Sequence, residues 1–84
     1  AASLIPGGSD YAVFQKGFIL GLQKKYSEKV REMDRLIADY PNSEYVDDAL
    51  YEKGRSYVLM ENANQAASAF NQLLKEHPQS SFAN

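Results

Sequence analysis

The sequence predicts an all-α fold made of two tandem helix-turn-helix units. The main observation is an internal repeat, because residues 11–47 align with residues 48–84 without a gap. Seven of the 37 aligned pairs are identical, whereas unrelated segments would match at roughly 2 positions. The identical residues are Ala12, Lys16, Gly17, Leu22, Leu36, Pro41 and Ser43, each repeated 37 positions later. Such a period is typical of a stacked array in which each unit buries a face on the next.

The first unit contains two segments with helical periodicity. The first, residues 9 to about 23, is dense in large apolar residues and has Ser9 or Asp10 as a candidate N-cap. The second, residues 26 to about 40, places an apolar stripe opposite a charged face that includes Glu32. Pro41 ends this helix because it disfavours helical geometry in the residue before it.

The second unit repeats this pattern. We expect a helix from residue 44 to about 60, capped by Asn42 or Ser43, and another from residue 63 to about 77 that Pro78 ends. Asn62 followed by Gln65 predicts a capping box before the last helix. Residues 1–10 are expected to be a lead segment or linker, and residues 11–84 one domain of two units. Since residues 81–84 align with residues 44–47, we expect a fragment of a longer array.

Composition and charge exclude several classes of function. A net charge of −2 gives no clustered basic face for nucleic acid. Zero cysteines and a single histidine, His77, leave no disulfide, thiolate metal site or cysteine nucleophile. We therefore expect no catalytic residue, no metal site, no cofactor and no enzyme activity. The longest apolar stretch, residues 18–22, is far shorter than the ~20 residues of a membrane span.

The spacing of several residues resembles a known repeat. In the second unit, five residues have the G-x2-Y…A-x3-F…P spacing of the tetratricopeptide repeat. They are Gly54, Tyr57, Ala66, Phe70 and Pro78. The first unit keeps Val13, Gly17, Leu20, Met33 and Pro41 at the same spacing. Residues 9 to about 78 thus resemble a tandem pair of this family, which implies a right-handed α-solenoid.

Three lysines depart from the family pattern. Lys16 and Lys53 stand where the family usually has leucine, and Lys29 stands where it usually has alanine. A lysine can lay its apolar stem on a core while its ammonium group stays in water. The glycines fit better, because Gly17 and Gly54 stand where two antiparallel helices approach closely.

The 37-residue period exceeds the family's usual 34 by three residues that follow the proline. The run from Tyr40 to Ser43 resembles a subgroup in bacterial cell-envelope proteins, which includes outer-membrane-assembly lipoproteins and periplasmic coordinators of envelope constriction. This resemblance implies a periplasmic location in a Gram-negative bacterium, with the cytoplasm as the alternative. It also leaves open a lipid anchor on the parent chain.

The resemblance implies that the first helix of each unit lines a concave groove. The residues expected to line it are Tyr11, Phe14, Phe18, Asp48, Tyr51 and Arg55. Aromatic and arginine side chains are the residue types that anchor protein interfaces. We therefore expect a scaffold module whose groove binds a peptide or a helix of a protein partner.

Three alternatives remain open for these residues. In the first two, the chain is a structural spacer, and the groove packs either on neighbouring repeats or on residues 1–10. In the third, the chain forms a weak dimer through the same surface. Arg55 has a local alternative of its own, an ion pair with Glu52 or Asp48.

Overall fold

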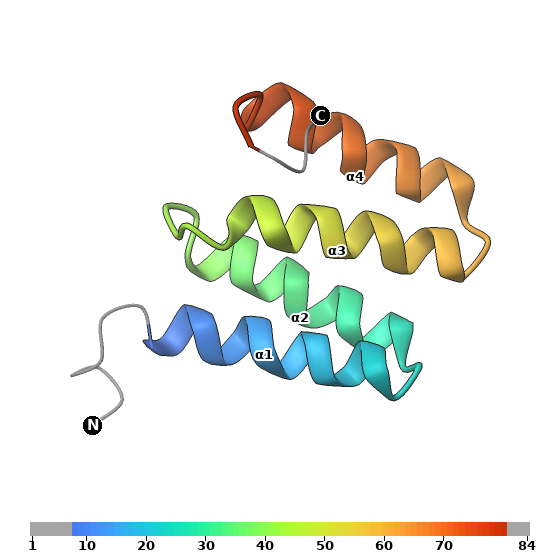
Figure 1. The fold of residues 1–84 in the computed structure, drawn as a ribbon, viewed down its shortest axis with the longest axis horizontal. Coiled ribbons are helices and arrows are strands. Elements are labelled where there is room, and N and C mark those ends of the chain that lie inside the picture. Colours follow the sequence, from blue (N-terminus) through green and yellow to red (C-terminus); the bar gives the residue numbers. More distant parts are fainter. Residues whose placement is uncertain (1–7, 81–84) are drawn as a thin grey trace.

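The computed structural model of the chain describes residues 8–80. In this part it forms four α-helices: α1 (Gly8–Leu22), α2 (Tyr26–Asp39), α3 (Val46–Leu59) and α4 (Ala63–Glu76). The helices pair as two hairpins, α1 with α2 and α3 with α4, and the hairpins pack side by side (Figure 1). The predicted all-α fold of two tandem helical units is confirmed. Residues 1–7 of the expected linker and residues 81–84 of the second unit lie outside the described part.

Two helices begin at other residues than expected. α1 begins at Gly8, so Asp10 lies within its first turn. α3 begins at Val46 instead of residue 44. The Ser43 hydroxyl accepts a hydrogen bond from the Tyr45 N–H at 3.0 Å, and the Val46 N–H donates to the Ser43 carbonyl at 3.2 Å. These bonds hold the chain in a turn, and helical geometry starts only after it.

The turns between the helices of each hairpin have the same backbone conformation. Lys24 and Glu61, which are 37 positions apart, have φ angles of 62° and 60°. The next residue, Lys25 or Asn62, donates its N–H back to a carbonyl of the preceding helix at 2.9 or 2.8 Å, as in a Schellman motif. Asn62 also accepts from the Gln65 N–H at 3.3 Å, which is one of the two bonds of the expected capping box, while the Asn62 N–H donates to the Tyr57 carbonyl. The repeat in the sequence is therefore a repeat of structure.

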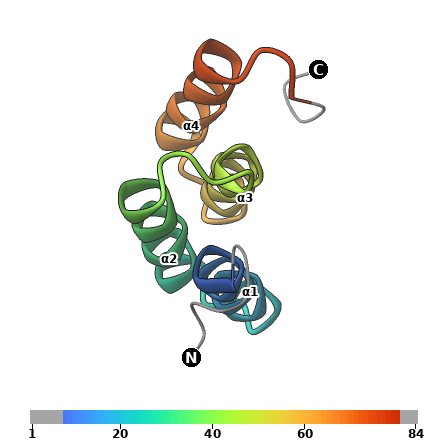
Figure 2. The same ribbon diagram turned by 90° about the vertical axis from the view of Figure 1, so that its left-hand side faces the viewer.

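The helices form two layers, with α1 and α3 in one and α2 and α4 in the other (Figure 2). The centre of the core lies between α2 and α3. Met33 and Leu36 of α2 and Ala49 and Leu50 of α3 are all 0% exposed. Because these residues come from different units, the same apolar burial that folds the chain also joins the two hairpins.

Gly17 and Gly54 allow the two helices of each hairpin to approach closely. A Cβ atom at Gly54 would lie 2.5 Å from the Phe70 ring, and one at Gly17 would lie 2.7 Å from the terminal methyl of Met33. Both distances are shorter than real carbon–carbon contacts, which lie near 3.5–4.0 Å. The expected role of both glycines is confirmed.

Lys29 is buried, and the expectation that its ammonium group stays in water is wrong. The residue is 6% exposed, and its Nζ lies 2.7 Å from Glu52 Oε1 of α3. Gly21 of α1 makes room for the stem, because a Cβ there would lie 2.8 Å from Lys29 Cδ. Lys53 forms an ion pair with Asp34 of α2 at 2.6 Å, whereas Lys16 stays largely exposed.

Glu32 also differs from the expectation, since it does not lie on a solvent-exposed face. The residue is 9% exposed. Its Oε2 lies 3.6 Å from Lys16 Nζ and its Oε1 lies 3.7 Å from Arg35 Nη1. The reason is that α1 and α3 both pack on α2, so that a larger part of its circumference is covered than one apolar stripe predicts.

We predict that Gly54→Ala destabilises the protein more than Gly17→Ala. Three atoms of the Phe70 ring lie within 2.8 Å of the added Cβ, and a ring cannot yield by rotating one bond, whereas the methyl of Met33 can. Overpacking of this kind costs about 1–3 kcal/mol. Urea unfolding of both variants measures the difference. Equal or higher stability of Gly54→Ala would contradict the close approach.

A second prediction concerns the Lys29–Glu52 pair. Lys29→Met leaves the Glu52 carboxylate in a largely buried position with only Arg55 nearby, at 3.7 Å. We expect a loss of about 3 kcal/mol in the free energy of unfolding, the low end for a broken buried pair. The double variant Lys29→Met/Glu52→Gln should recover most of that loss, because no uncompensated charge remains. If the effects of the two substitutions on the free energy of unfolding are additive, Lys29 and Glu52 do not stabilise each other, and the prediction is wrong.

Candidate functional site

The residues expected on α1 share one face of that helix. Tyr11, Phe14 and Phe18 follow each other at about one helical turn, and the Phe14 and Phe18 rings stack with centroids 6.5 Å apart. Tyr11 and Phe18 are each 44% exposed although they are large and apolar. A shallow pocket lies on this face, and Gln15 and Ile19 complete its lining. The structure therefore brings these three aromatic residues together at an accessible surface.

Tyr45 belongs to the same group, and the sequence analysis did not assign it to the site. Its ring lies 5.5 Å from that of Tyr11 and 5.6 Å from that of Phe14. Tyr45 precedes α3, so it connects α1 with the start of the second unit. The only signal in the sequence is its aromatic match with Phe82, 37 positions later. Tyr11, Phe14, Phe18 and Tyr45 are called the aromatic cluster below.

The residues expected on α3 have more varied surroundings. The Tyr51 ring lies 6.2 Å from Phe70 of α4, and Tyr51 packs partly against the core. Asp48 is half-buried, and Arg55 is exposed. Arg55 Nη1 lies 3.7 Å from Glu52 Oε2, so the local ion pair considered for Arg55 is present. Tyr51 thus supports the fold, while Asp48 and Arg55 line the surface.

Positive charge gathers where α1 and α3 approach each other near Phe18. Lys29 Nζ lies 5.9 Å from the centroid of the Phe18 ring and 2.7 Å from Glu52 Oε1. Arg55 approaches the other oxygen of the same carboxylate. Two cations therefore share one carboxylate, and this end of the surface carries a net positive charge.

Negative charge gathers at the start of α3. Glu44, Asp47 and Asp48 lie within five residues of each other, and the ion pairs found in residues 8–80 involve none of them. Burial raises the pKa of Asp48, and the charges of Asp47, Glu52 and Glu44 raise it further. The ionised form of Asp48 is therefore less favourable in the folded state than in water.

Tyr45 lies in the same negative field. Desolvation raises the pKa of its phenol, and Glu44, Tyr11, Asp10 and Asp48 contribute in that order. Of these carboxylates, Asp10 already has partners: it accepts hydrogen bonds from the Ser43 hydroxyl and from the Tyr11 N–H, the latter at 2.8 Å. The aromatic cluster is thus bordered by carboxylates on one side.

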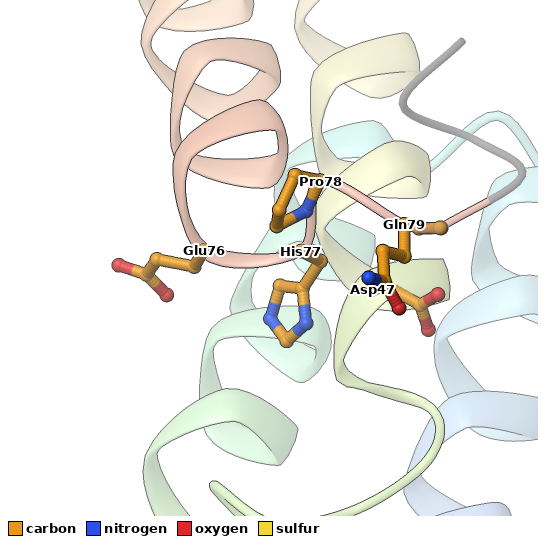
Figure 3. A pocket seen from close by; sticks show the side chains of 6 residues that line it. Asp47, Glu76, His77, Pro78 and Gln79 are labelled. Carbon is orange, nitrogen blue, oxygen red and sulfur yellow. The ribbon is translucent and has the colours of Figure 1, made fainter.

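A second pocket lies where the end of α4 meets the start of α3, away from the aromatic cluster. Figure 3 shows Asp47 beside Gln79, with Glu76 pointing away from them. Asp47 and Ser80 both line this pocket, and they are the repeat equivalents of Asp10 and Ser43, which are hydrogen-bonded to each other. The pocket therefore lies at the place in the second unit that corresponds to the Asp10–Ser43 hydrogen bond.

The described part of the chain contains neither a cluster of metal-binding side chains nor a helix that could cross a membrane. Residues 8–80 contain no group of three or more histidine, cysteine, aspartate or glutamate side chains that could hold a metal ion. The helices in this range are too short and too polar to span a bilayer. The surface of α1 and α3 is the candidate site because it carries the exposed Tyr11, Phe18 and Arg55.

We predict that Asp48→Asn stabilises the protein at neutral pH. The folded-state pKa of Asp48 is raised, so its ionised form destabilises the folded state above that pKa, and the effect disappears as pH falls toward 3.8, the ordinary pKa of an aspartate. The variant should therefore exceed the wild type in free energy of unfolding at pH 7, and the difference should shrink on acidification. Urea unfolding over this pH range measures it. Glu28→Gln, an exposed residue in the first turn of α2, is the control. A less stable Asp48→Asn at pH 7 would contradict the prediction.

Comparison with known proteins identifies the repeat. A family model described as tetratricopeptide repeat matches residues 11–43 and again residues 48–80. Searches of curated proteins and of solved structures returned no match. The two matched segments cover more than half of the chain and coincide with the two hairpins. The chain therefore belongs to the tetratricopeptide repeat family.

Proposed function

We propose that this chain is a non-enzymatic interaction module that binds a peptide or a helix of a partner protein in the groove formed by α1 and α3. Repeats of this family mediate protein–protein interaction, and stacked repeats present an extended concave surface for it. The observation that carries the proposal is the exposure of Tyr11 and Phe18. Both are 44% exposed, while the core closes without them.

The residue types of the groove support this function. Tyrosine, phenylalanine and arginine supply much of the binding energy in protein interfaces, because they bury a large area at a small cost in conformational entropy. Tyr11, Phe18 and Arg55 are all exposed, and ring contacts join Tyr11 to Tyr45 and Phe18 to Phe14. A partner would therefore meet a surface whose side chains are largely held in place before binding.

The competing function is a structural spacer. Two contacts favour it, since Tyr51 packs on Phe70 and Arg55 already has Glu52 as a partner. Under this alternative the aromatic cluster packs on a neighbouring repeat or on a second copy of the chain.

Two wider proposals concern the parent protein. A role within a larger scaffold rests on the repeat architecture. An envelope location rests on the run from Tyr40 to Ser43 alone.

The test uses residues that contribute little to the core. Peptide ligands are selected from a random library displayed on phage, and their affinity is compared for the wild type and for Tyr11→Ala/Phe18→Ala. Phe14 and Tyr51 are left intact because both pack against the core. We expect a loss of roughly 30-fold in affinity, which corresponds to about 2 kcal/mol for interface anchors.

The control is Leu74→Ala on α4, where Leu74 is 50% exposed but lies in the other layer. This variant should bind within about twofold of the wild type, a difference of less than 1 kcal/mol. Circular dichroism and urea unfolding confirm that each variant is folded. The proposal fails if no ligand is selected, or if Leu74→Ala weakens binding as much as the double variant does.

A further inference from the structure

The groove has opposite charges at its two ends. At the start of α3, Glu44 and Asp48 have no basic partner within residues 8–80. Further along the same helix, Arg55 shares the Glu52 carboxylate with Lys29. One end is therefore in excess of negative charge and the other in excess of positive charge.

The separation of the two ends is set by helix geometry. Asp48 and Arg55 are seven residues apart on α3, which is close to two turns, so both lie on the same face at a spacing of about 10 Å along the axis. Tyr11 and Phe18 of α1 are also seven residues apart, and both face the same surface. The aromatic residues of α1 thus extend over the same length of two helical turns as Asp48 and Arg55 on α3.

We propose that the groove binds a protein segment that carries a lysine or arginine at one end, a carboxylate about two helical turns away, and apolar side chains between them. This inference rests on the proposed function and specifies the partner. The basic side chain lies at the start of α3, beside Asp48 and over the face of Tyr11 or Tyr45. The carboxylate pairs with Arg55, and the apolar side chains pack on Tyr11, Phe14 and Phe18.

Charge complementarity selects this occupant over others. A cation close to aromatic faces and to several carboxylates gains both cation–π and ionic attraction. The raised pKa of Asp48 supports the need for a cation, because a partner's positive charge would offset the repulsion from Asp47, Glu52 and Glu44. An acidic segment would meet like charge at Asp48, and a purely basic one would meet it at Arg55.

The helix dipole accounts for only part of the negative end. Asp47 and Asp48 lie in the first turn of α3, where the positive end of the dipole favours carboxylates. Glu44, however, precedes the helix, and the surroundings of Asp48 still disfavour its ionised form.

The experiment uses four synthetic peptides with one apolar sequence and capped termini. Their two variable positions, seven residues apart, hold Lys and Glu, Lys and Lys, Glu and Glu, or Gln and Gln. Fluorescence anisotropy measures binding to the full chain at low and high salt. We expect the Lys/Glu peptide to bind about tenfold more tightly than the Gln/Gln peptide, the Glu/Glu peptide to bind most weakly, and high salt to reduce the differences.

Two variants test which residue of the protein recognises each charge of the peptide. Asp48→Asn should remove the advantage that lysine gives, and Arg55→Gln should remove the advantage that glutamate gives. The matched controls are Asp39→Asn and Arg31→Gln, which change exposed charges on α2 and should leave the ranking of the peptides unchanged. Urea unfolding and circular dichroism of Asp48→Asn at pH 7 show whether the variant is folded, so that weaker binding can be separated from a lost fold.

The outcomes separate this inference from the proposed function. If the four peptides bind equally and all lose affinity with Tyr11→Ala/Phe18→Ala, the groove binds partners without reading charge, and only this inference fails. If the Lys/Lys or the Glu/Glu peptide binds most tightly, the polarity is wrong. If none of the four binds while peptides selected from the library do, the inference also fails. If no peptide of either kind binds, the proposed function fails with it.

Discussion

The packing of α2 against α3 is the interaction on which the rest of the structure depends. Met33 and Leu36 meet Ala49 and Leu50 there, and all four are fully buried. A single helical hairpin buries too little apolar surface to be stable alone, so the second hairpin completes the core of the first. The Lys29–Glu52 pair crosses the same interface and is costly unless both partners are present.

This interface also positions the candidate groove. Because α2 and α3 pack closely, α1 and α3 lie in one layer (Figure 2). The Lys29 stem passes Gly21 of α1 and ends beside Phe18, so the core interaction extends to the surface. A substitution at Lys29 would consequently affect the fold and the charge of the groove together. The buried pair links stability with the electrostatic character of the proposed binding surface.

The aromatic residues of the groove could be predicted from the sequence only in part. Tyr11, Phe14 and Phe18 recur at the helical period, and this local rule places them on one face of α1. Tyr45 lies outside the helices, and its position over Tyr11 depends on the turn that Ser43 holds. No periodicity applies to such a residue. Tyr51 has the spacing of a groove residue, but its contact with Phe70 of α4 arises only when the hairpin closes.

The sequence by itself determined the helices, the two hairpins and the family, because these follow from local spacing, proline positions and a repeat of fixed period. The tertiary structure alone decided which polar groups are buried and which charges lack partners. Lys29 and Glu52 are 23 residues apart, and Ser43 and Asp10 are 33 residues apart. Whether such groups meet depends on the packing of one helix against another, which no local pattern contains. For this reason the polarity of the groove emerges only from the folded molecule.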